Sequence, residues 1–251
     1  MATHLVLIPS YNSGPKLLQT VAEARSFWND VWVVVDGSTD GSGAELARIA
    51  VDDPGVRVLV HPRNLGKGAA ILSGLRAAEE SGFTHVLTMD ADGQHSAAAI
   101  PEFMALSRAN PGALILGVPV FDASAPRLRV VGRRVSNWWA NLETLWLGIE
   151  DSLFGFRVYP LADLRAVMER TRWMRRFDFD AEAAVRLCWR GLPLISRPAA
   201  IRYLRADEGG VSHFNYLRDN LLLTWMHMRL LCGFIPRLPS LIVRRIRSFR
   251  R

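Results

Sequence analysis

The stretch VLTMDADGQH, residues 86–95, decides how the rest of the sequence is interpreted. It begins with apolar and β-branched residues, which are typical of a strand buried within a sheet, and it ends abruptly in two aspartates. In an extended segment every second side chain points the same way, so Asp90, Asp92 and Gln94 would present three oxygen-bearing groups on one side. This arrangement predicts a partial ligand shell for a hard divalent cation, Mg²⁺ or Mn²⁺.

A polar loop whose acids only cap a helix is the alternative, and the surroundings of the stretch decide between the two. Similar runs rich in valine, isoleucine and leucine lie at residues 4–10, 31–37, 56–62 and 113–120. Helical patterns separate the runs, at residues 15–28, 41–51, 66–81 and 97–109. This alternation predicts an α/β protein with a Rossmann-like, mostly parallel central sheet flanked by helices. Ligands of such sheets bind at the carboxyl ends of the strands, where Asp90 and Asp92 would lie.

The pattern changes after residue 118. A loop is predicted at residues 121–129, followed by helices at 131–148, 161–171 and 178–190 and by strands at 151–160 and 192–204. The last part combines an apolar helical pattern at residues 215–233 with an arginine-rich end. We therefore divide the chain into a domain at residues 1–214 and a helical, basic C-terminal extension at residues 215–251.

Polar residues follow each of the first strands, and parallel strands bring them to one edge of the sheet. Tyr11 follows the first strand and Asp36 ends the second, where a carboxylate can accept hydrogen bonds from a nucleoside or open an Asx-turn. Two glycines flank Lys67 where a helix begins, and such a helix start favours anions such as a diphosphate. A helix start with a solvated lysine is the simpler reading. The spacing is that of neither a P-loop nor a dinucleotide fingerprint.

Together these motifs resemble the family-2 glycosyltransferases with the GT-A fold, among them the dolichyl- and polyprenyl-phosphate sugar transferases. The matching stretches, spread over residues 4–204, are IPSYN, VVVDGSTDGS, NLGKGAA, MDADGQH, DSLFGFRVYP and FDFDAEAAVRLCWRGLP. The resemblance implies a nucleotide-diphosphate sugar donor, a divalent cation on the Asp-x-Asp pair, and inversion at the anomeric carbon. The residues expected to bind the donor are Pro9, Tyr11, Asn12, Asp36, Lys67, Asp90 and Ala91.

Two departures from the family pattern concern the substrates. Val35 stands where the family commonly has the first of two aspartates. Residues 117–119 read Gly-Val-Pro where the polyprenyl-phosphate enzymes tend to have Gly-Ser-Arg, so one expected ligand of an acceptor phosphate is missing. Arg133, Arg134 and Ser136 still resemble a second acceptor-phosphate cluster, and they are equally typical of the cationic start of a solvated helix.

The acceptor class therefore stays open between two enzymatic readings and a third, non-catalytic one. The first is transfer to a lipid or polyprenyl phosphate at a membrane. The second is transfer to a hydroxyl group of a glycan or a lipid-like natural product. The third is a catalytically silent module that binds a sugar nucleotide.

Three further positions are candidates for the chemistry. Arg157 stands where the family often closes the site near the transferred sugar, although an edge-strand surface arginine would look the same. Asp180 and Glu182 are candidates for a general base, and the sequence does not choose between them. A hydroxyl acceptor needs such a base, whereas an ionised phosphate does not. His213 follows two glycines, so loop closure could bring it to the cation or the diphosphate.

Charge and hydropathy bear on partners and location. The formal charge is +7, and residues 237–251 carry six arginines and no acid among apolar residues. This composition predicts contact with an anionic membrane surface, the alternative being apolar residues packed on the domain with solvated arginines. No signal peptide, membrane span or disulfide framework is evident. We expect a cytoplasmic protein, peripheral on the inner face of the cytoplasmic membrane, without a nucleic-acid partner.

Overall fold

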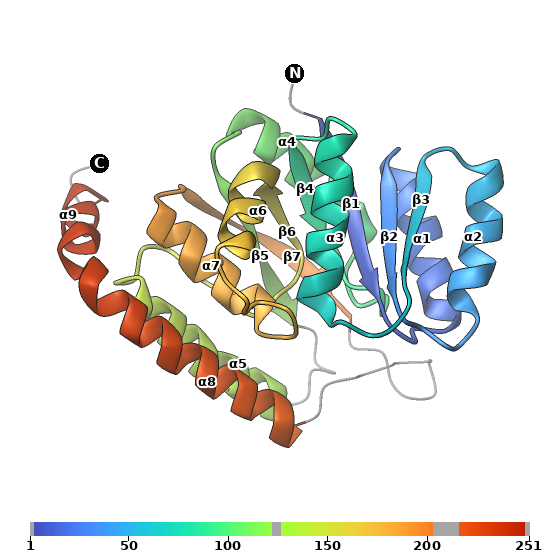
Figure 1. Cartoon of the computed structure of the whole chain (residues 1–251). Coiled ribbons are helices and arrows are strands. Elements are labelled where there is room, and N and C mark those ends of the chain that lie inside the picture. The colour runs from blue at the N-terminus through green and yellow to red at the C-terminus, as the bar shows by residue number, and fades with distance from the viewer. Residues whose placement is uncertain (1–2, 122–126, 203–215, 249–251) are drawn as a thin grey trace.

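The computed structural model describes residues 3–121, 127–202 and 216–248, and a seven-stranded sheet runs through its centre (Figure 1). The strands are β1 (His4–Ser10), β2 (Val31–Asp36), β3 (Val56–His61), β4 (His85–Thr88), β5 (Leu114–Phe121), β6 (Arg157–Pro160) and β7 (Leu194–Ile201). Their order across the sheet is β3-β2-β1-β4-β6-β5-β7. Strand β6 is antiparallel to both of its neighbours, and the other pairs are parallel. The predicted mostly parallel sheet is confirmed.

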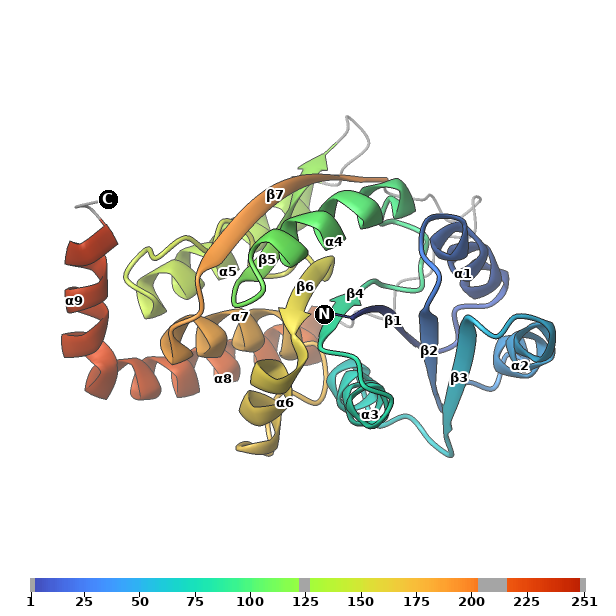
Figure 2. The same ribbon diagram turned by 90° about the horizontal axis from the view of Figure 1, so that it is seen from above.

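Helices cover both faces of the sheet, as the view from above shows (Figure 2). They are α1 (Pro15–Phe27), α2 (Ser42–Asp52), α3 (Lys67–Glu80), α4 (Ile100–Ala109), α5 (Arg127–Glu143), α6 (Leu161–Glu169), α7 (Phe179–Arg190), α8 (Tyr216–Phe234) and α9 (Leu238–Ser248). Two short 3₁₀ helices, η1 (Ala97–Ala99) and η3 (Ile235–Arg237), precede α4 and α9. Each helix predicted from the sequence is present, with shifted ends.

The core has two layers because side chains of a strand alternate between the two faces of the sheet. In β1, Val6 and Ile8 pack with buried residues of α1, α2 and α4. Leu5 and Leu7 pack on the opposite face with buried residues of α3, α6 and α7 and also of α5 and α8. The burial of β1 on both faces accounts for its continuous apolar sequence.

Strand β6 and helix α5 are both shorter than the sequence predicted. Of the predicted strand at 151–160, the first part turns because Oδ1 of Asp151 accepts hydrogen bonds from the backbone N–H groups of Leu153 (3.0 Å) and Phe154 (2.7 Å). Helix α5 ends at Glu143 rather than 148 because Leu145 and Trp146 adopt left-handed backbone conformations, with φ of 51° and 53°.

Helix α8 packs against α5 and α7, and α9 continues from it (Figure 1). Met226 and Leu230 of α8 are fully buried in the main core cluster, so α8 is built into the body that residues 1–214 were expected to form alone. In α9, Leu241 is buried, and Arg244 donates a hydrogen bond to the carbonyl oxygen of Cys188. This part of the chain thus packs on the domain, whereas exposed apolar side chains remain at Ile235, Ile242, Val243 and Ile246.

Candidate active site

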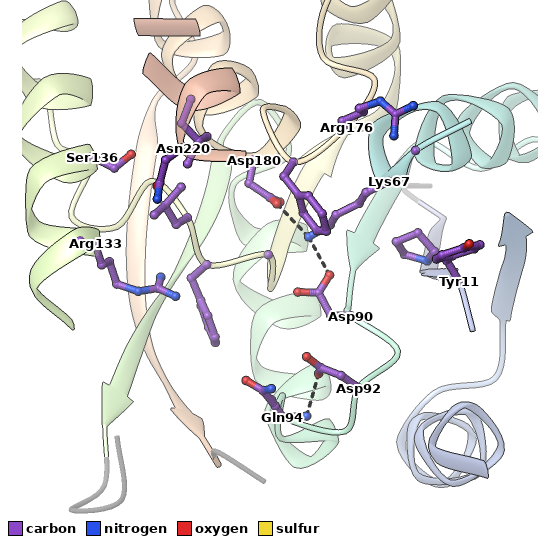
Figure 3. Close-up of a pocket in the computed structure, with 18 of the residues that line it drawn as sticks. Tyr11, Lys67, Asp90, Asp92, Gln94, Arg133, Ser136, Arg176, Asp180 and Asn220 are labelled. Atoms are coloured by element: carbon purple, nitrogen blue, oxygen red, sulfur yellow. Dashed lines mark hydrogen bonds and ion pairs between the residues drawn. The ribbon is translucent and has the colours of Figure 1, made fainter. Parts of the chain in front are cut away.

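A cavity of about 890 Å³ opens at the carboxyl ends of β1, β2 and β4 and continues between α5 and α8. Most of the residues predicted for the site line it: Pro9, Tyr11, Asp36, Lys67, Asp90, Ala91, Asp92, Gln94, Arg133, Ser136 and Asp180. Figure 3 shows Tyr11 on one side, Arg133 and Ser136 on the other, and Asp90, Lys67 and Asp180 between them. The sheet edge therefore gathers residues that are scattered along the sequence.

Lys67, the first residue of α3, joins two acids from distant parts of the chain. Its Nζ atom lies 2.6 Å from Oδ1 of Asp90 and donates a 2.8 Å hydrogen bond to Oδ2 of Asp180 (Figure 3). Burial alone would lower the pKa of Lys67, but the charges of Asp180 and Asp90 outweigh it and raise that pKa above its ordinary value. Lys67 therefore stays protonated and places a positive charge in the middle of the cavity.

The glycines around Lys67 allow the segment before α7 to approach. A Cβ atom on Gly66 would lie 2.3 Å from the carbonyl oxygen of Arg175, and one on Gly68 would lie 2.1 Å from that of Met174. The backbone N–H of Ala69 donates a 3.1 Å hydrogen bond to the Arg175 carbonyl. The close contact places the start of α7, and with it Asp180, beside Lys67.

The Asp-x-Asp pair carries unequal carboxyl groups. Burial by itself would raise the pKa of Asp90, but the attraction of Lys67 holds it below the ordinary value. Within the described residues Asp92 forms no ion pair of this kind, and burial together with the charge of Asp90 raises its pKa to about 6. Its Oδ1 atom accepts a 3.0 Å hydrogen bond from the backbone N–H of Gln94. The pair holds more negative charge than the nearby lysine balances.

His95 fixes the loop that carries this pair. The backbone N–H of Asp90 donates a 3.1 Å hydrogen bond to Nδ1 of the ring, and Nε2 faces Oδ2 of Asp90 at 3.7 Å. Burial lowers the pKa of His95 to about 4, so the ring is neutral at physiological pH and carries its proton on Nε2. His95 ends the stretch DADGQH, but the spacing of its oxygen-bearing residues did not indicate this role for the histidine.

Asp36 holds the loop that follows β3. Its Oδ1 atom is 2.7 Å from Nδ1 of His61 and accepts a 2.9 Å hydrogen bond from the N–H of Leu65, while Oδ2 accepts a 2.7 Å bond from that of Gly66. This buried carboxylate thus sets the path of the chain into α3. Its role toward a nucleoside stays a prediction.

The structure separates the two acids between which the sequence did not choose. Asp180 lines the cavity, and its buried Oδ1 atom has no hydrogen-bond partner among the described residues. Glu182 is fully buried and does not line the cavity, and its two oxygens each lie 2.7 Å from an arginine, Arg186 and Arg229. The geometry therefore favours Asp180 as the acid that faces a substrate.

Arg157 lies behind the cavity and not at its surface. Its guanidinium donates hydrogen bonds to the backbone carbonyl oxygens of Asp180 and Asp151 (the latter at 3.1 Å), and the side chain is fully buried. It thereby fixes the backbone at Asp180. This placement argues against a direct contact between Arg157 and a transferred sugar. It favours a role in positioning Asp180.

The acceptor cluster predicted on α5 is divided in the structure. Arg133 lines the cavity and pairs with Asp151 at 2.6 Å, and Ser136 lines it at the buried side of the helix. Arg134 is exposed and lies outside the cavity lining. Asn12 is likewise not part of the lining, because its Oδ1 atom accepts a hydrogen bond from the N–H of Thr39 (2.8 Å) and holds the neighbouring loop. His213 lies outside the described residues.

Helix α8 forms a wall of the cavity that the sequence analysis missed. The wall consists of Arg218, Asn220, Leu223, Thr224, His227 and Met228. Three polar residues of this wall are Asn220, Thr224 and His227. They follow one another at intervals of four and three, which is the spacing of one helix face. That pattern was a usable signal. Asn64, Arg176 and Phe177 also line the cavity. Asn64 and Phe177 begin two of the stretches that match the family, NLGKGAA and FDFDAEAAVRLCWRGLP, but neither residue was assigned a role, and Arg176 belongs to no motif.

A divalent cation is compatible with this chemistry. The described residues contain no cluster of three or more histidine, cysteine or acidic side chains arranged for a metal. Asp90 and Asp92 offer carboxylate oxygens with Gln94 nearby, and no ion pair involves Asp92 among the residues that the structure describes. Hard cations such as Mg²⁺ and Mn²⁺ are often bound by one or two carboxylates together with substrate phosphates. The residues present fit an ion that is shared with a substrate.

Similar proteins place the chain among glycosyltransferases. An undecaprenyl-phosphate mannosyltransferase from Micrococcus luteus is 27% identical over 252 aligned positions, which cover 91% of this chain and 98% of the relative. A polyprenol monophosphomannose synthase from Mycolicibacterium smegmatis is 31% identical over 66% of this chain and 63% of the relative.

Solved structures share the fold. The glucosyl-3-phosphoglycerate synthase of Mycobacterium tuberculosis superposes with a TM-score of 0.64 at 17% identity, over 94% of this chain and 80% of that one. A mannosyltransferase from Pyrobaculum calidifontis, in complex with GDP-Man and Mn²⁺, gives a TM-score of 0.56 at 18% identity, over 80% and 57% of the two chains. These likenesses confirm the predicted GT-A fold.

The family model of glycosyl transferase family 2 matches residues 5–162, which is more than half of the chain. The matched part carries the first six strands of the sheet, Lys67 and the Asp-x-Asp pair. The chain therefore belongs to glycosyl transferase family 2.

Proposed function

We propose that this glycosyltransferase moves a sugar, with inversion, from a nucleoside-diphosphate sugar to the phosphate of a membrane lipid, and that it needs a divalent cation. One observation carries the proposal. A single cavity holds the Asp90–Asp92 pair and Lys67 on one side and Arg133 and Ser136 on the other. The first group suits a metal-bound diphosphate, and the second suits a separate anion.

The donor belongs at the sheet edge. Tyr11 and Asp36 line this part of the cavity with Asn64, which provides an aromatic wall and polar groups for a nucleoside. Asp90 and Asp92 would hold the cation, which when bound neutralises charge on the leaving diphosphate. Lys67 supplies a positive charge at this place, because its Nζ atom lies 2.6 Å from Asp90. We infer that it turns from Asp90 toward the diphosphate once the cation occupies the carboxylates.

The acceptor belongs on the α5 side of the cavity. Inversion requires the acceptor oxygen to attack the sugar from the face opposite the leaving diphosphate. Arg133 and Ser136 lie across the cavity from Tyr11, so they can orient an acceptor for this attack (Figure 3). An ionised phosphate needs no general base. Two of the relatives are named as enzymes of undecaprenyl phosphate and polyprenol phosphate, which supports this acceptor class.

A hydroxyl acceptor is the second candidate, and Asp180 favours it. This acid lines the cavity and sits beside Lys67, and its buried Oδ1 atom has no hydrogen-bond partner in the described part of the chain. A carboxylate in this place could take the proton of an attacking hydroxyl group. In addition, a Cβ atom on Gly117 would lie 2.5 Å from the carbonyl oxygen of Phe156, so the segment at 117–119 is packed against the loop before β6 and offers no cationic side chain.

Helix α8 supports a location at a membrane surface because large apolar side chains are exposed on its outer side. Its acidic residue Asp219 is fully buried and Arg229 is mostly buried, whereas Leu217, Leu221, Trp225 and Met228 on the outer side are at least half exposed. On α5, Val131, Val135 and Trp138 are also exposed. Apolar helix faces of this kind bind at the boundary of headgroups and acyl chains.

Both apolar faces border the cavity, since Val135 and Met228 belong to its lining. The described part of the chain has no helix with the length and hydrophobicity of a membrane span. We propose that the protein lies peripherally on the cytoplasmic face of the membrane, with its cavity open to the lipid.

A donor and acceptor screen tests the proposal. Purified protein is incubated with GDP-Man, UDP-Glc or UDP-GlcNAc, with undecaprenyl phosphate or a membrane extract, and with or without Mn²⁺, and products are identified by mass spectrometry. We expect one glycosylated lipid phosphate that forms only with the cation. Transfer to a hydroxyl acceptor alone would select the second candidate. Nucleotide binding without any transfer or hydrolysis would leave a sugar-nucleotide-binding module.

A further inference from the structure

A chain of polar side chains links α5 to α8 on the acceptor side of the cavity. Oε1 of Glu143 lies 2.9 Å from Nδ1 of His227, and Nε2 of His227 lies 3.3 Å from Oγ of Ser136. The Ser136 hydroxyl is also 3.2 Å from that of Ser152. His227 and Ser136 line the cavity, and Glu143 is fully buried behind them. The proposed function makes no use of Glu143 or His227.

If these side chains only joined the two helices, the link would lower the free energy of unfolding, because it buries polar and charged groups. The same buried side of α8 packs with apolar residues, Met226 and Leu230, which join helices without burying charge. Glu143 is buried with a second oxygen, Oε2, that has no hydrogen-bond partner among the described residues. Burial raises the pKa of Glu143 in spite of its contact with His227. A buried polar pair of this kind calls for a functional explanation.

The geometry gives the imidazole a direction. Because Nδ1 is engaged by Glu143, the other nitrogen of the ring, Nε2, is the one that lies on the side of Ser136 and the cavity. Whenever the Glu143–His227 pair holds two protons, the pair is neutral and Nε2 carries a hydrogen that can be donated. Ring Nε2 and the Ser136 hydroxyl then offer two hydrogen-bond donors near Arg133, which is one turn away on α5. Such a group of donors suits phosphate oxygens.

Resting on the proposed function, we infer that His227, oriented by Glu143, donates a hydrogen bond from Nε2 to the phosphate of the acceptor lipid and so selects phosphate over hydroxyl acceptors. Other charged groups near the pair are Glu182 on α7, which acts on Glu143 from behind, and the Arg133–Asp151 ion pair on the cavity side. The cation and donor residues lie elsewhere in the cavity, so the role of His227 concerns the acceptor alone.

Two matched variants separate this role from a structural one. His227→Gln places an amide nitrogen near the position of Nε2, toward the cavity. His227→Asn places it near that of Nδ1, toward Glu143. Binding of farnesyl phosphate and of its neutral counterpart farnesol is measured by calorimetry on the full chain in detergent. Binding of a nucleoside diphosphate with Mn²⁺ reports whether the donor site of each variant is intact.

We expect the Asn variant to lose about 10- to 100-fold in affinity for farnesyl phosphate, the range for a hydrogen bond to a charged group. Its affinity for farnesol should not change, and the Gln variant should stay within about threefold of the parent. Any other pattern overturns the inference, including equal loss in both variants or retention in the Asn variant. If the parent protein binds farnesol as well as the phosphate, the proposed lipid-phosphate acceptor fails first, and the inference fails with it.

Discussion

Lys67 and Asp180 are separated by 113 positions in the sequence, and Nζ of Lys67 lies 2.8 Å from Oδ2 of Asp180. Neither residue belongs to the Asp-x-Asp stretch, yet the same ammonium group also contacts Asp90. One lysine therefore connects the acid expected to bind a cation with a second acid that lines the same cavity. If a bound cation released Lys67 from Asp90, cation binding would be coupled to a rearrangement at Asp180.

Replacing Lys67 tests this bridge. We expect Lys67→Met to lower the free energy of unfolding by about 3 kcal/mol, because it leaves buried carboxylates without their partner. Urea denaturation at neutral pH measures the loss. Lys16→Met, at the other lysine of the chain, is the control and should change little. The double variant Lys67→Met/Asp180→Leu should recover part of the loss. A single variant as stable as the parent would show that the bridge contributes nothing.

Replacing Asp92 tests the cation site. Asp92→Asn keeps the size of the side chain and removes its charge, so we expect sugar transfer to fall about 100-fold or more, in line with the several kcal/mol that a cation supplies. The circular dichroism spectrum should not change. Asp52→Asn, at an exposed position of α2, is the matched control. Full activity of Asp92→Asn at saturating Mn²⁺ would remove the cation from the proposed function.

The raised pKa of Asp92, about 6, predicts two opposite dependences on pH. Binding of Mn²⁺ with a nucleoside diphosphate should be strongest above about pH 7 and weaken as the pH falls through 6, because protonation removes the charge of Asp92. Without cation, the folded protein binds this proton more tightly than the unfolded chain does. Its contribution to stability is therefore present at low pH and lost as the pH rises through 6.

Calorimetric titrations and urea denaturation between pH 5 and pH 8 measure these two dependences. Both should become smaller in Asp92→Asn, which has no carboxyl group to titrate at this position. The dependence of binding that remains comes from the terminal phosphate of the nucleotide, which itself titrates near pH 6. A cation affinity that stays constant over this range in the parent protein would contradict the assignment of Asp92 as a cation ligand.

Replacing Leu221 tests the membrane surface. The side chain of Leu221 is 62% exposed on the outer side of α8, and that of Val51 on α2 is 81% exposed. We expect Leu221→Glu to weaken co-sedimentation with phosphatidylglycerol-containing vesicles about tenfold or more, the cost of losing one inserted leucine. Val51→Glu should bind as the parent does. Equal behaviour of the two variants would place the contact elsewhere.

The two cysteines provide an independent test of the same surface. Cys232 is exposed on α8, and Cys188 is buried with its pKa raised to about 11 by that burial. A maleimide at pH 7.5 should therefore modify Cys232 quickly and Cys188 only in urea. Adding anionic vesicles should slow the reaction of Cys232. Unchanged labelling in vesicle-bound protein would show that α8 does not face the lipid.

The sequence by itself determined the sheet, the order of its helices and the edge of the sheet at which the polar residues gather. These follow from local rules, because a buried parallel strand must be apolar throughout and its carboxyl end must carry the polar groups. Asp90, Asp92 and Gln94 were expected to share one side of an extended strand end. In the structure β4 ends at Thr88 and residues 91–93 form a turn, so the loop and not strand alternation brings these residues to the cavity. The glycines around Lys67 also marked the start of α3 correctly.

The tertiary structure decided which face of each helix is inside, and that choice separated the candidates. Asp180 and Glu182 are two residues apart on α7, yet one faces the cavity and the other binds Arg186 and Arg229 in the core. The same is true of α8, which turns His227 to the cavity. A sequence gives the period of a helix, but its orientation depends on the partners that it packs against, and those come from distant segments of the chain.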